Sequence, residues 1–343
     1  MTLIKCEEGS YKVPGFIDLQ VNGFAGADYN SSQTPLEAIA TSLRTIFSTG
    51  VTRVLATVIT GSPADMLGAL KHMTRAQREL PEGRAIAGYH VEGPHISADD
   101  GPRGAHPARW VRKPDVSEFQ RWQEATDGQV KLVTLAPEWP EAPAYIEAVV
   151  REGAAVSIGH TGASREQIEA AVSAGATLST HLGNGAHKIL PRHPNYLWEQ
   201  LAEDRLSASF IVDGLHLSDS FLRVALRAKT VARSILVTDA VMPAMCAPGS
   251  YMLGEVEVEL KADQRVVLRG GDRLAGSSLR MDAAIANVMR LADVTLEDAV
   301  TMATANPGRL CGIESNGTTT FRLEDGRVRV IETVLDGEVV YRA

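Results

Sequence analysis

The feature that most constrains the fold of this sequence is a regular alternation of short apolar runs with longer helical patterns. Eight such runs occupy residues 15–20, 51–59, 85–91, 130–135, 154–159, 177–181, 206–212 and 235–238. Short continuous apolar runs are typical of parallel strands that are buried on both faces. Eight β-then-α units favour a (β/α)8 barrel over an open doubly wound sheet. We therefore predict an α/β chain with a TIM-like barrel.

Polar residues just before several helical patterns predict where the helices begin. Thr34, Ser62, Ser164 and Thr295 each stand where a side-chain oxygen would accept a bond from a free backbone N–H group. Proline follows Thr34 and Ser62 directly, and proline is common at the first helical position.

The pattern of apolar and polar residues changes after the eighth apolar run. Residues 251–260, 265–268 and 327–340 alternate like exposed strands, with helical patterns at 281–291 and 296–303 between them. We expect these C-terminal segments to form a small β appendage. The predicted division is a catalytic barrel of residues 14–250 and 272–310, and a small β domain of residues 1–13, 251–271 and 311–343.

The composition excludes several classes of protein. The formal net charge is −8 and no basic run is interleaved with aromatics, so nucleic acid is not expected as a partner. No run approaches the roughly 18 apolar residues of a membrane helix, and residues 1–10 do not resemble a secretory signal. The three cysteines are far apart and odd in number, which favours a reducing compartment. We expect a cytoplasmic protein that acts on a small molecule.

Ionisable residues recur where the predicted strands end. Glu92 ends the third, His160 the fifth, His181 the sixth and Asp239 the eighth. In a barrel of this kind the active site lies at the C-terminal ends of the strands. A lone histidine there is more often structural, and a lone aspartate can cap the next helix. Four such residues at one end favour a catalytic mouth.

Two histidines and a glutamate form a ligand set that suits Zn²⁺ and leaves positions open for water and substrate. A separate carboxylate can then take a proton from water and pass it to a leaving nitrogen, and Asp239 is the candidate for both steps. The sequence leaves the roles of four other histidines open. His90 and His95 fit either the site or packing, while His187 and His193 lie in a polar loop that can face the substrate.

Seven motifs in order carry a family resemblance. They occupy residues 14–23 (PGFIDLQVNG), 90–94 (HVEGP), 159–161 (GHT), 180–184 (THLGN), 213–216 (DGLH), 237–240 (VTDA) and 274–278 (LAGSS). As a set they resemble the N-acetylglucosamine-6-phosphate deacetylases of the amidohydrolase superfamily. The resemblance runs from about residue 13 to the C-terminus. Family members usually carry several β-strands before the PGFID run, whereas thirteen residues precede it here. The resemblance therefore implies a small, reduced β-sandwich appendage.

The resemblance implies that Glu92, His160 and His181 bind the catalytic metal and that Asp239 shuttles the proton. Many superfamily members carry a His-x-His pair for a second metal on the first strand, where this chain has Gln20 and Asn22. Because an amide replaces imidazole poorly on Zn²⁺, we expect a single divalent ion. Zn²⁺ is the first expectation, and Fe²⁺, Co²⁺ and Mn²⁺ accept the same ligands. Gln20 is then expected to position the acetyl group.

The resemblance also implies contacts with an N-acetylated amino sugar. The residues concerned are Gln20, Ala105, His106, Asn184, Gly185, Arg192, Asp213, His216, Leu274, Ala275 and Gly276. For Asp213 and His216, the sequence alone does not decide between a substrate contact and a loop that only begins the next helix. Arg192 stands where the family has a phosphate-binding arginine that reaches into the partner subunit, which implies a homodimer.

Two stretches depart from the family pattern. Residues 181–187 read HLGNGAH where the family usually has His-Leu-x-Asn-Ala-Met, and residues 192–195 read RHPN where it has Arg-Glu-Pro-Gly. The metal ligand and the arginine survive, but their setting changes. Deacetylation of another or an unphosphorylated N-acetylhexosamine, or another cyclic-amide or N-acyl hydrolysis, therefore stays open. A non-catalytic sugar-phosphate binder is disfavoured because all four candidate catalytic residues are present.

Overall fold

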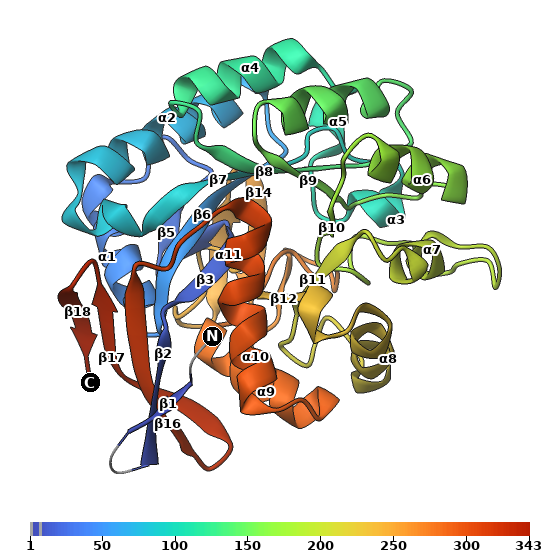
Figure 1. Cartoon of the computed structure of the whole chain (residues 1–343). Coiled ribbons are helices and arrows are strands. Elements are labelled where there is room, and N and C mark those ends of the chain that lie inside the picture. Colours follow the sequence, from blue (N-terminus) through green and yellow to red (C-terminus); the bar gives the residue numbers. More distant parts are fainter. Residues whose placement is uncertain (1–2, 7–8) are drawn as a thin grey trace.

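Eight parallel strands form the central barrel in the computed structural model, which describes residues 3–6 and 9–343. Their bounds are β3 (Phe16–Val21), β6 (Val51–Ile59), β7 (Ile86–Glu92), β8 (Val130–Leu135), β9 (Ala155–Ile158), β10 (Leu178–Ser179), β11 (Ser207–Ile211) and β12 (Ser234–Val237). Neighbours in sequence pair in order around the sheet. A parallel bridge joins Val21, the last residue of β3, to Ala240, which lies just beyond the end of β12. The predicted barrel is confirmed (Figure 1).

The strands sit where the apolar runs predicted them, with one shortening. The run at 177–181 forms only the two-residue β10, because the chain turns into the site at His181, whose backbone N–H donates to Ser209 Oγ at 2.8 Å. The other seven strands agree with prediction to within two residues at each end.

Helices cover the outside of the barrel (Figure 1). Their bounds are α1 (Leu36–Phe47), α2 (Pro63–Glu79), α3 (Asp100–Arg103), α4 (Val116–Ala125), α5 (Ala142–Arg151), α6 (Arg165–Ser173), α7 (Tyr196–Ala202), α8 (Asp219–Lys229), α9 (Met281–Ala292), α10 (Leu296–Ala303) and α11 (Ala305–Cys311). Short 3-10 turns in the described part of the chain include Pro81–Ala85, Ala108–Trp110 and Val231–Arg233. No helix in the described part is both long and apolar enough to cross a membrane.

Three of the four predicted helix caps are confirmed. Ser62 accepts from the third residue of α2, and Ser164 and Thr295 form reciprocal capping boxes at α6 and α10. The cap at Thr34 is wrong, because its hydroxyl donates to the Asp28 carbonyl at 2.6 Å and α1 begins after an uncapped Pro35. The Thr34 hydroxyl therefore bonds to strand β5 (Ala27–Asp28) and not to the helix. Strand β5 pairs with β4 (Gly23–Phe24).

The segments at the two ends of the chain form one antiparallel sheet beside the barrel. Its order is β1 (Ile4–Lys5), β2 (Ser10–Pro14), β16 (Gly317–Glu324), β17 (Arg327–Leu335) and β18 (Glu338–Arg342). Phe321 packs 6.2 Å from the Phe16 ring, and the Thr319 hydroxyl donates to the Gly50 carbonyl at 2.6 Å. The small β appendage is thus attached at the N-terminal end of the first strands. Residues 1, 2, 7 and 8 of its predicted first segment lie outside the described residues.

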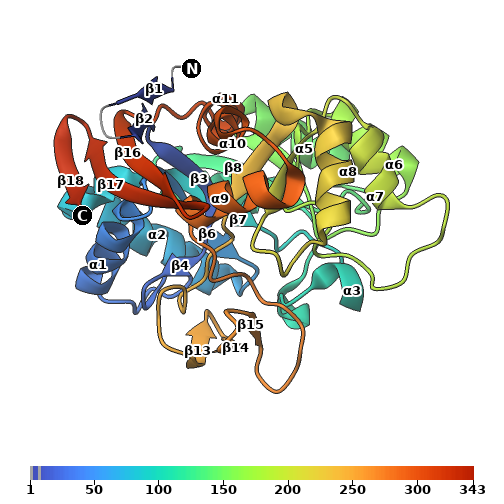
Figure 2. The same ribbon diagram turned by 90° about the horizontal axis from the view of Figure 1, so that it is seen from below.

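Residues 251–271 do not join that sheet, contrary to the predicted grouping. They lie in a separate sheet of β13 (Gly249–Leu253), β14 (Val256–Leu260) and β15 (Val266–Leu268). Figure 2 shows this sheet on the far side of the barrel from β16–β18. The reason is apolar packing: Leu253, Val258 and Val266 are buried together with Val241, which follows the last barrel strand. The predicted domain division as a whole stays a prediction.

Candidate active site

Three candidate site residues have left-handed backbone conformations just beyond their strands. The φ angles are 51° at His160, 28° at His181 and 50° at Asp239. For residues other than glycine, this conformation costs on the order of 1–3 kcal/mol and persists only where the surroundings impose it. These backbone conformations just after β9, β10 and β12 set the directions of the three side chains at the barrel mouth.

The structure brings the three predicted metal ligands together around one carboxylate oxygen. Glu92 Oε1 lies 3.0 Å from His181 Nε2 and 3.4 Å from His160 Nε2. The two imidazole nitrogens are 3.1 Å apart. All three side chains are buried.

The hydrogen bonds of His160 determine which nitrogen faces the group. Its Nδ1 lies 2.9 Å from the Pro102 carbonyl, which can only accept, so Nδ1 carries the proton. The Nε2 lone pair then points at Glu92 and His181. A buried carboxylate with the Nε2 atoms of two imidazoles beside it is a donor set that fits a divalent cation such as Zn²⁺.

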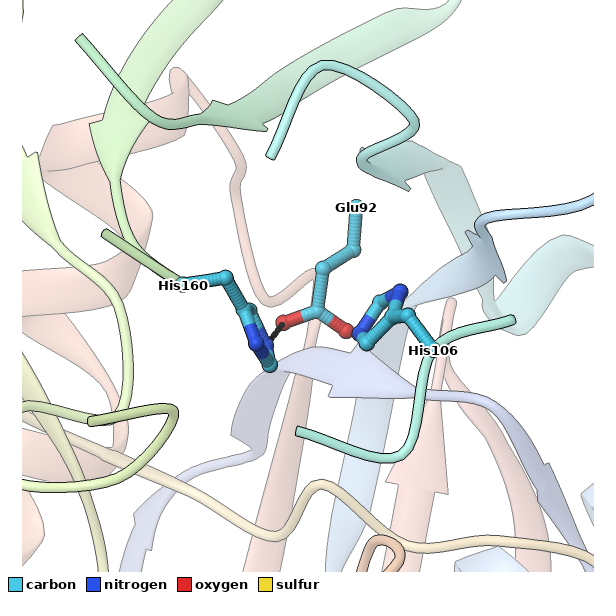
Figure 3. A group of neighbouring side chains, drawn as sticks. All are labelled: Glu92, His106 and His160. Carbon is cyan, nitrogen blue, oxygen red and sulfur yellow. Dashed lines mark ion pairs between the residues drawn. The ribbon is translucent and has the colours of Figure 1, made fainter. Parts of the chain in front are cut away.

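A second, overlapping group contains His106 in place of His181. Glu92, His106 and His160 offer ligand atoms within 4.8 Å of one another, and Figure 3 shows the three side chains turned toward a common point. The His106 ring lies 4.3 Å from that of His160, and its Nδ1 is 2.8 Å from Thr60 Oγ1. The distances favour the set with His181, whose Nε2 is within about 3 Å of both other ligand atoms.

Asp239 joins the site through two amides. Asn22 Nδ2 donates to Asp239 Oδ1 at 2.7 Å, and Gln20 Nε2 donates to the same oxygen at 3.1 Å. Gln20 Nε2 also donates to Glu92 Oε1 at 2.8 Å, while its oxygen accepts from the Thr180 hydroxyl. Gln20 therefore orients both carboxylates. Its predicted contact with an acetyl group stays a prediction.

The surroundings shift the pKa values of Glu92 and Asp239 in opposite directions. Burial favours the neutral form of Glu92, but the neighbouring His160 and His181 imidazoles outweigh burial and hold the pKa of Glu92 well below its usual range. Burial, reinforced by the charge of Glu92, raises the pKa of Asp239 to about 6. Two titratable groups pushed apart in this way are a mark of acid–base sites.

A cavity of about 740 Å³ opens over this group. Most of the predicted substrate contacts line it, namely Ala105, His106, Asn184, Gly185, His216, Leu274, Ala275 and Gly276. Asp213 lies behind His216, with its Oδ2 2.6 Å from His216 Nδ1. Arg192 is exposed in the loop between β10 and α7 and is not part of the lining.

Several lining residues were not predicted. They are Asn22, Asp100, Asp272 and Arg273, together with Lys188 and the strongly exposed Ile189. Only Asn22 had a signal, since it alternates with Gln20 on the first strand. Asp100 begins the four-residue helix α3 and the others lie on loops, where no periodicity indicates which side chain turns inward.

The histidines left open by the sequence now divide. His90 is buried inside the barrel, 2.8 Å from the Thr134 hydroxyl, and the His95 ring packs against Trp122 and Tyr145. His187 lines the cavity, with its Nδ1 3.0 Å from the Tyr196 hydroxyl. His193 is exposed and lies outside the lining.

The fold and site define the class of protein. The chain forms a parallel eight-stranded barrel with buried carboxylates and imidazoles at its mouth. Its sequence matches the profile of the amidohydrolase family over residues 11–319. The chain therefore belongs to the amidohydrolase family.

Its relatives narrow the assignment. N-acetylglucosamine-6-phosphate deacetylase from Homo sapiens is 34% identical over 98% of this chain and 84% of its own length. The enzyme of that name from Vibrio furnissii is 32% identical over 88% of this chain and 74% of its own. A solved structure of N-acetyl-D-glucosamine-6-phosphate deacetylase from Mycobacterium smegmatis, a variant in complex with N-acetyl-D-glucosamine-6-phosphate, superposes with a TM-score of 0.87 at 28% identity, covering 96% of this chain and 86% of that one. Within the amidohydrolases, this chain belongs to the N-acetylglucosamine-6-phosphate deacetylase family.

Proposed function

We propose that the protein is a metal-dependent hydrolase that removes acetate from N-acetylglucosamine 6-phosphate and leaves glucosamine 6-phosphate. The observation that carries the proposal is the meeting of Glu92, His160 and His181 within 3.4 Å of one another, beside Asp239. The relatives that bear this activity in their names support the choice of substrate.

Glu92, His160 and His181 would hold one divalent ion. We propose Zn²⁺ first, with Fe²⁺, Co²⁺ and Mn²⁺ suited to the same donors. Such an ion, when bound, polarises a carbonyl and lowers the pKa of water. Gln20 and Asn22 occupy the first strand with amides that already bond to the carboxylates, which supports a single ion.

Asp239 would move the proton. Both amide donors meet its Oδ1, so Oδ2 is the oxygen left to accept a proton from the attacking water and return it to the departing nitrogen. The bond that forms joins the water oxygen to the acetyl carbon, and the bond that breaks is the amide C–N bond. Acetate and the free amine are the products.

The sugar would lie in the cavity against Asn184, Gly185 and His216. Asp213 accepts from His216 Nδ1 at 2.6 Å, which fixes the ring and leaves Nε2 for the substrate. Ala105, His106 and residues 274–276 would line the other side. We further propose that Arg192 binds the phosphate in the site of a partner subunit, as a homodimer would allow, and that the protein is cytoplasmic.

The test is release of acetate from a substrate panel by the zinc-loaded protein. We expect the fastest turnover with N-acetylglucosamine 6-phosphate. Faster turnover of its galactosamine isomer or of the free sugars would move the substrate assignment without changing the chemistry. If only hydantoins, dihydropyrimidines or N-acetyl amino acids react, the deacetylase proposal is wrong and another amidohydrolase reaction takes its place.

A further inference from the structure

Residues 99–106 support the candidate metal site from the solvent side. The segment contains α3 and supplies the Pro102 carbonyl that accepts from His160 Nδ1 at 2.9 Å. It also turns at Gly104, where an added Cβ would lie 3.4 Å from the His160 ring, and ends in His106, whose ring packs on that of His160. The direction of the His160 lone pair therefore depends on where this segment lies.

Arg273 reaches this segment from a distant part of the chain. Its Nη1 donates to Asp100 Oδ1 at 3.0 Å and its Nη2 to Asp100 Oδ2 at 2.7 Å. Nη1 also donates to the Gly104 carbonyl at 3.0 Å. A two-pronged pairing of guanidinium and carboxylate fixes orientation as well as distance. The side chain thus connects the loop after β15 to both ends of α3.

The same carboxylate is held from within the segment. Arg103 Nη2 donates to Asp100 Oδ1 at 2.7 Å, and Arg103 Nη1 donates to the His106 carbonyl at 2.8 Å. Asp100 and Arg273 both line the cavity. Together the two arginines and Asp100 join the cavity wall to the residues that surround His160.

We infer that Arg273 is a positioning residue that fixes residues 99–106 and, through the Pro102 carbonyl, orients His160 for metal binding. The inference rests on the proposed metal site. Asp100 is 70% exposed at its side chain and Arg273 is 33% exposed, so the pair contributes little to global stability. Its effect is local order.

The test compares Arg273→Met with Arg269→Met as a matched control. Arg269 lies on the same loop after β15, but its side chain pairs with Glu257 on β14 and does not line the cavity. Zinc affinity is measured by competition with a chelator, and hydrogen exchange is followed in peptides covering residues 99–106. We expect Arg273→Met to weaken zinc binding about three- to tenfold, somewhat less than the loss of a direct partner of a ligand. Exchange should rise in the segment, while the melting temperature matches the control.

Two further variants identify the cause. Arg273→Lys keeps the charge but not the two-pronged geometry and should give an intermediate loss. Asp100→Asn should also weaken zinc binding. The loss of affinity in the double variant should be smaller than the sum of the two single losses, because the Arg273–Asp100 contact is lost in all three.

Zinc affinity equal in Arg273→Met and Arg269→Met would overturn the inference, even if exchange in the segment rises. Neither readout uses a substrate. A protein that binds zinc as described but releases no acetate would therefore refute the proposed function alone.

Discussion

Asp239 and Glu92 show how neighbouring carboxyl groups acquire different tasks. Both are buried and both accept from Gln20, yet Glu92 faces two imidazoles whereas Asp239 faces amides and the charge of Glu92 itself. The first therefore stays ionised and suits a cation. The second has a pKa raised to about 6, so it can take up and release a proton near neutral pH.

Asp239→Asn is the direct test of that division. Asparagine can still accept from Asn22 and Gln20 at its oxygen, so the site should keep its shape, but it cannot carry the proton. We expect kcat to fall by about 10²–10⁴-fold while bound zinc stays at the wild-type level. Metal analysis and acetate assays check this. Asp272→Asn, in a carboxylate that also lines the cavity, should leave kcat near wild type. Full activity in Asp239→Asn would remove the proton-carrying role.

Gly185 has no side chain because the His160 ring occupies the space. Its φ is 56°, and an added Cβ would lie 2.8 Å from His160 Nδ1. Gly185→Ala should displace the ring from the Pro102 carbonyl and weaken zinc binding about 10–100-fold, as the loss of a ligand's hydrogen-bonding partner does. Chelator competition measures the change.

Gly128 provides the matched control for Gly185. Its φ of 76° imposes similar backbone strain on alanine, but nothing lies within 4 Å of the added Cβ. Both variants should lose about 1 kcal/mol of folding stability to that strain, and only Gly185→Ala should lose zinc affinity. An equal zinc affinity in the two variants would show that the contact with His160 is unimportant.

At the scale of elements, apolar periodicity and caps predicted most of what forms. The eight strands and the capped starts of α2, α6 and α10 follow from local patterns, because those patterns state which face is buried and which N–H groups need partners. Helix α11 was missed because Asn306, Pro307 and Gly308 read as a turn. There a Cβ added at Gly308 would lie 3.3 Å from the Ile17 side chain, so the helix lies close to β3. The Asn306 amide donates to the carbonyls of Val231 and Ser234, and these tertiary contacts override the local signal.

The last turn of α8 contains a buried cation that should make stability depend on pH. Lys229 Nζ donates to the carbonyls of Glu203 and Leu206 at 2.7 and 2.9 Å. Burial, with a smaller effect of Arg233, lowers the pKa of Lys229 to about 8. Between about pH 8 and 10.5 the unfolded chain binds a proton that the folded chain does not, so this residue makes the free energy of unfolding rise with pH. The neutral amine keeps two N–H groups for the two carbonyls.

Lys229→Met should remove that rise. Compared with wild type, the variant should be more destabilised at pH 9.5 than at pH 7, by about 2 kcal/mol. Chemical denaturation at the two pH values measures the difference. Lys261→Met, in an exposed pair with Glu259, should show no such change between the two pH values. Parallel behaviour of the Lys229 variant and wild type would mean that Lys229 keeps its ordinary pKa in the fold.

At the scale of the whole molecule, the site is assembled from segments that no local pattern brings together. Glu92, His160, His181 and Asp239 could be predicted because the barrel topology sends all strand ends to one mouth. Arg273 and Asp100 could not, since they lie 173 positions apart, Asp100 at the start of α3 and Arg273 on the loop after β15, and no local pattern indicates that the two meet. The separate burial of that sheet beside Val241 likewise depends on a surface that exists only in the folded barrel.

The proposed role of Arg192 depends on assembly, because this residue is exposed and lies outside the cavity of its own chain. If it serves a partner's site, Arg192→Met and Asp239→Asn should each be inactive alone yet complement each other. Half of randomly mixed dimers would be hybrids, each with one site that has Asp239 from one subunit and Arg192 from the other, so mixing should restore about a quarter of the wild-type activity. Subunits are exchanged under mild denaturation and acetate release is then assayed. Mixing two preparations of Arg192→Met is the control, and it should restore nothing. Failure of the two different variants to complement, although hybrids form, would place the action of Arg192 within its own subunit.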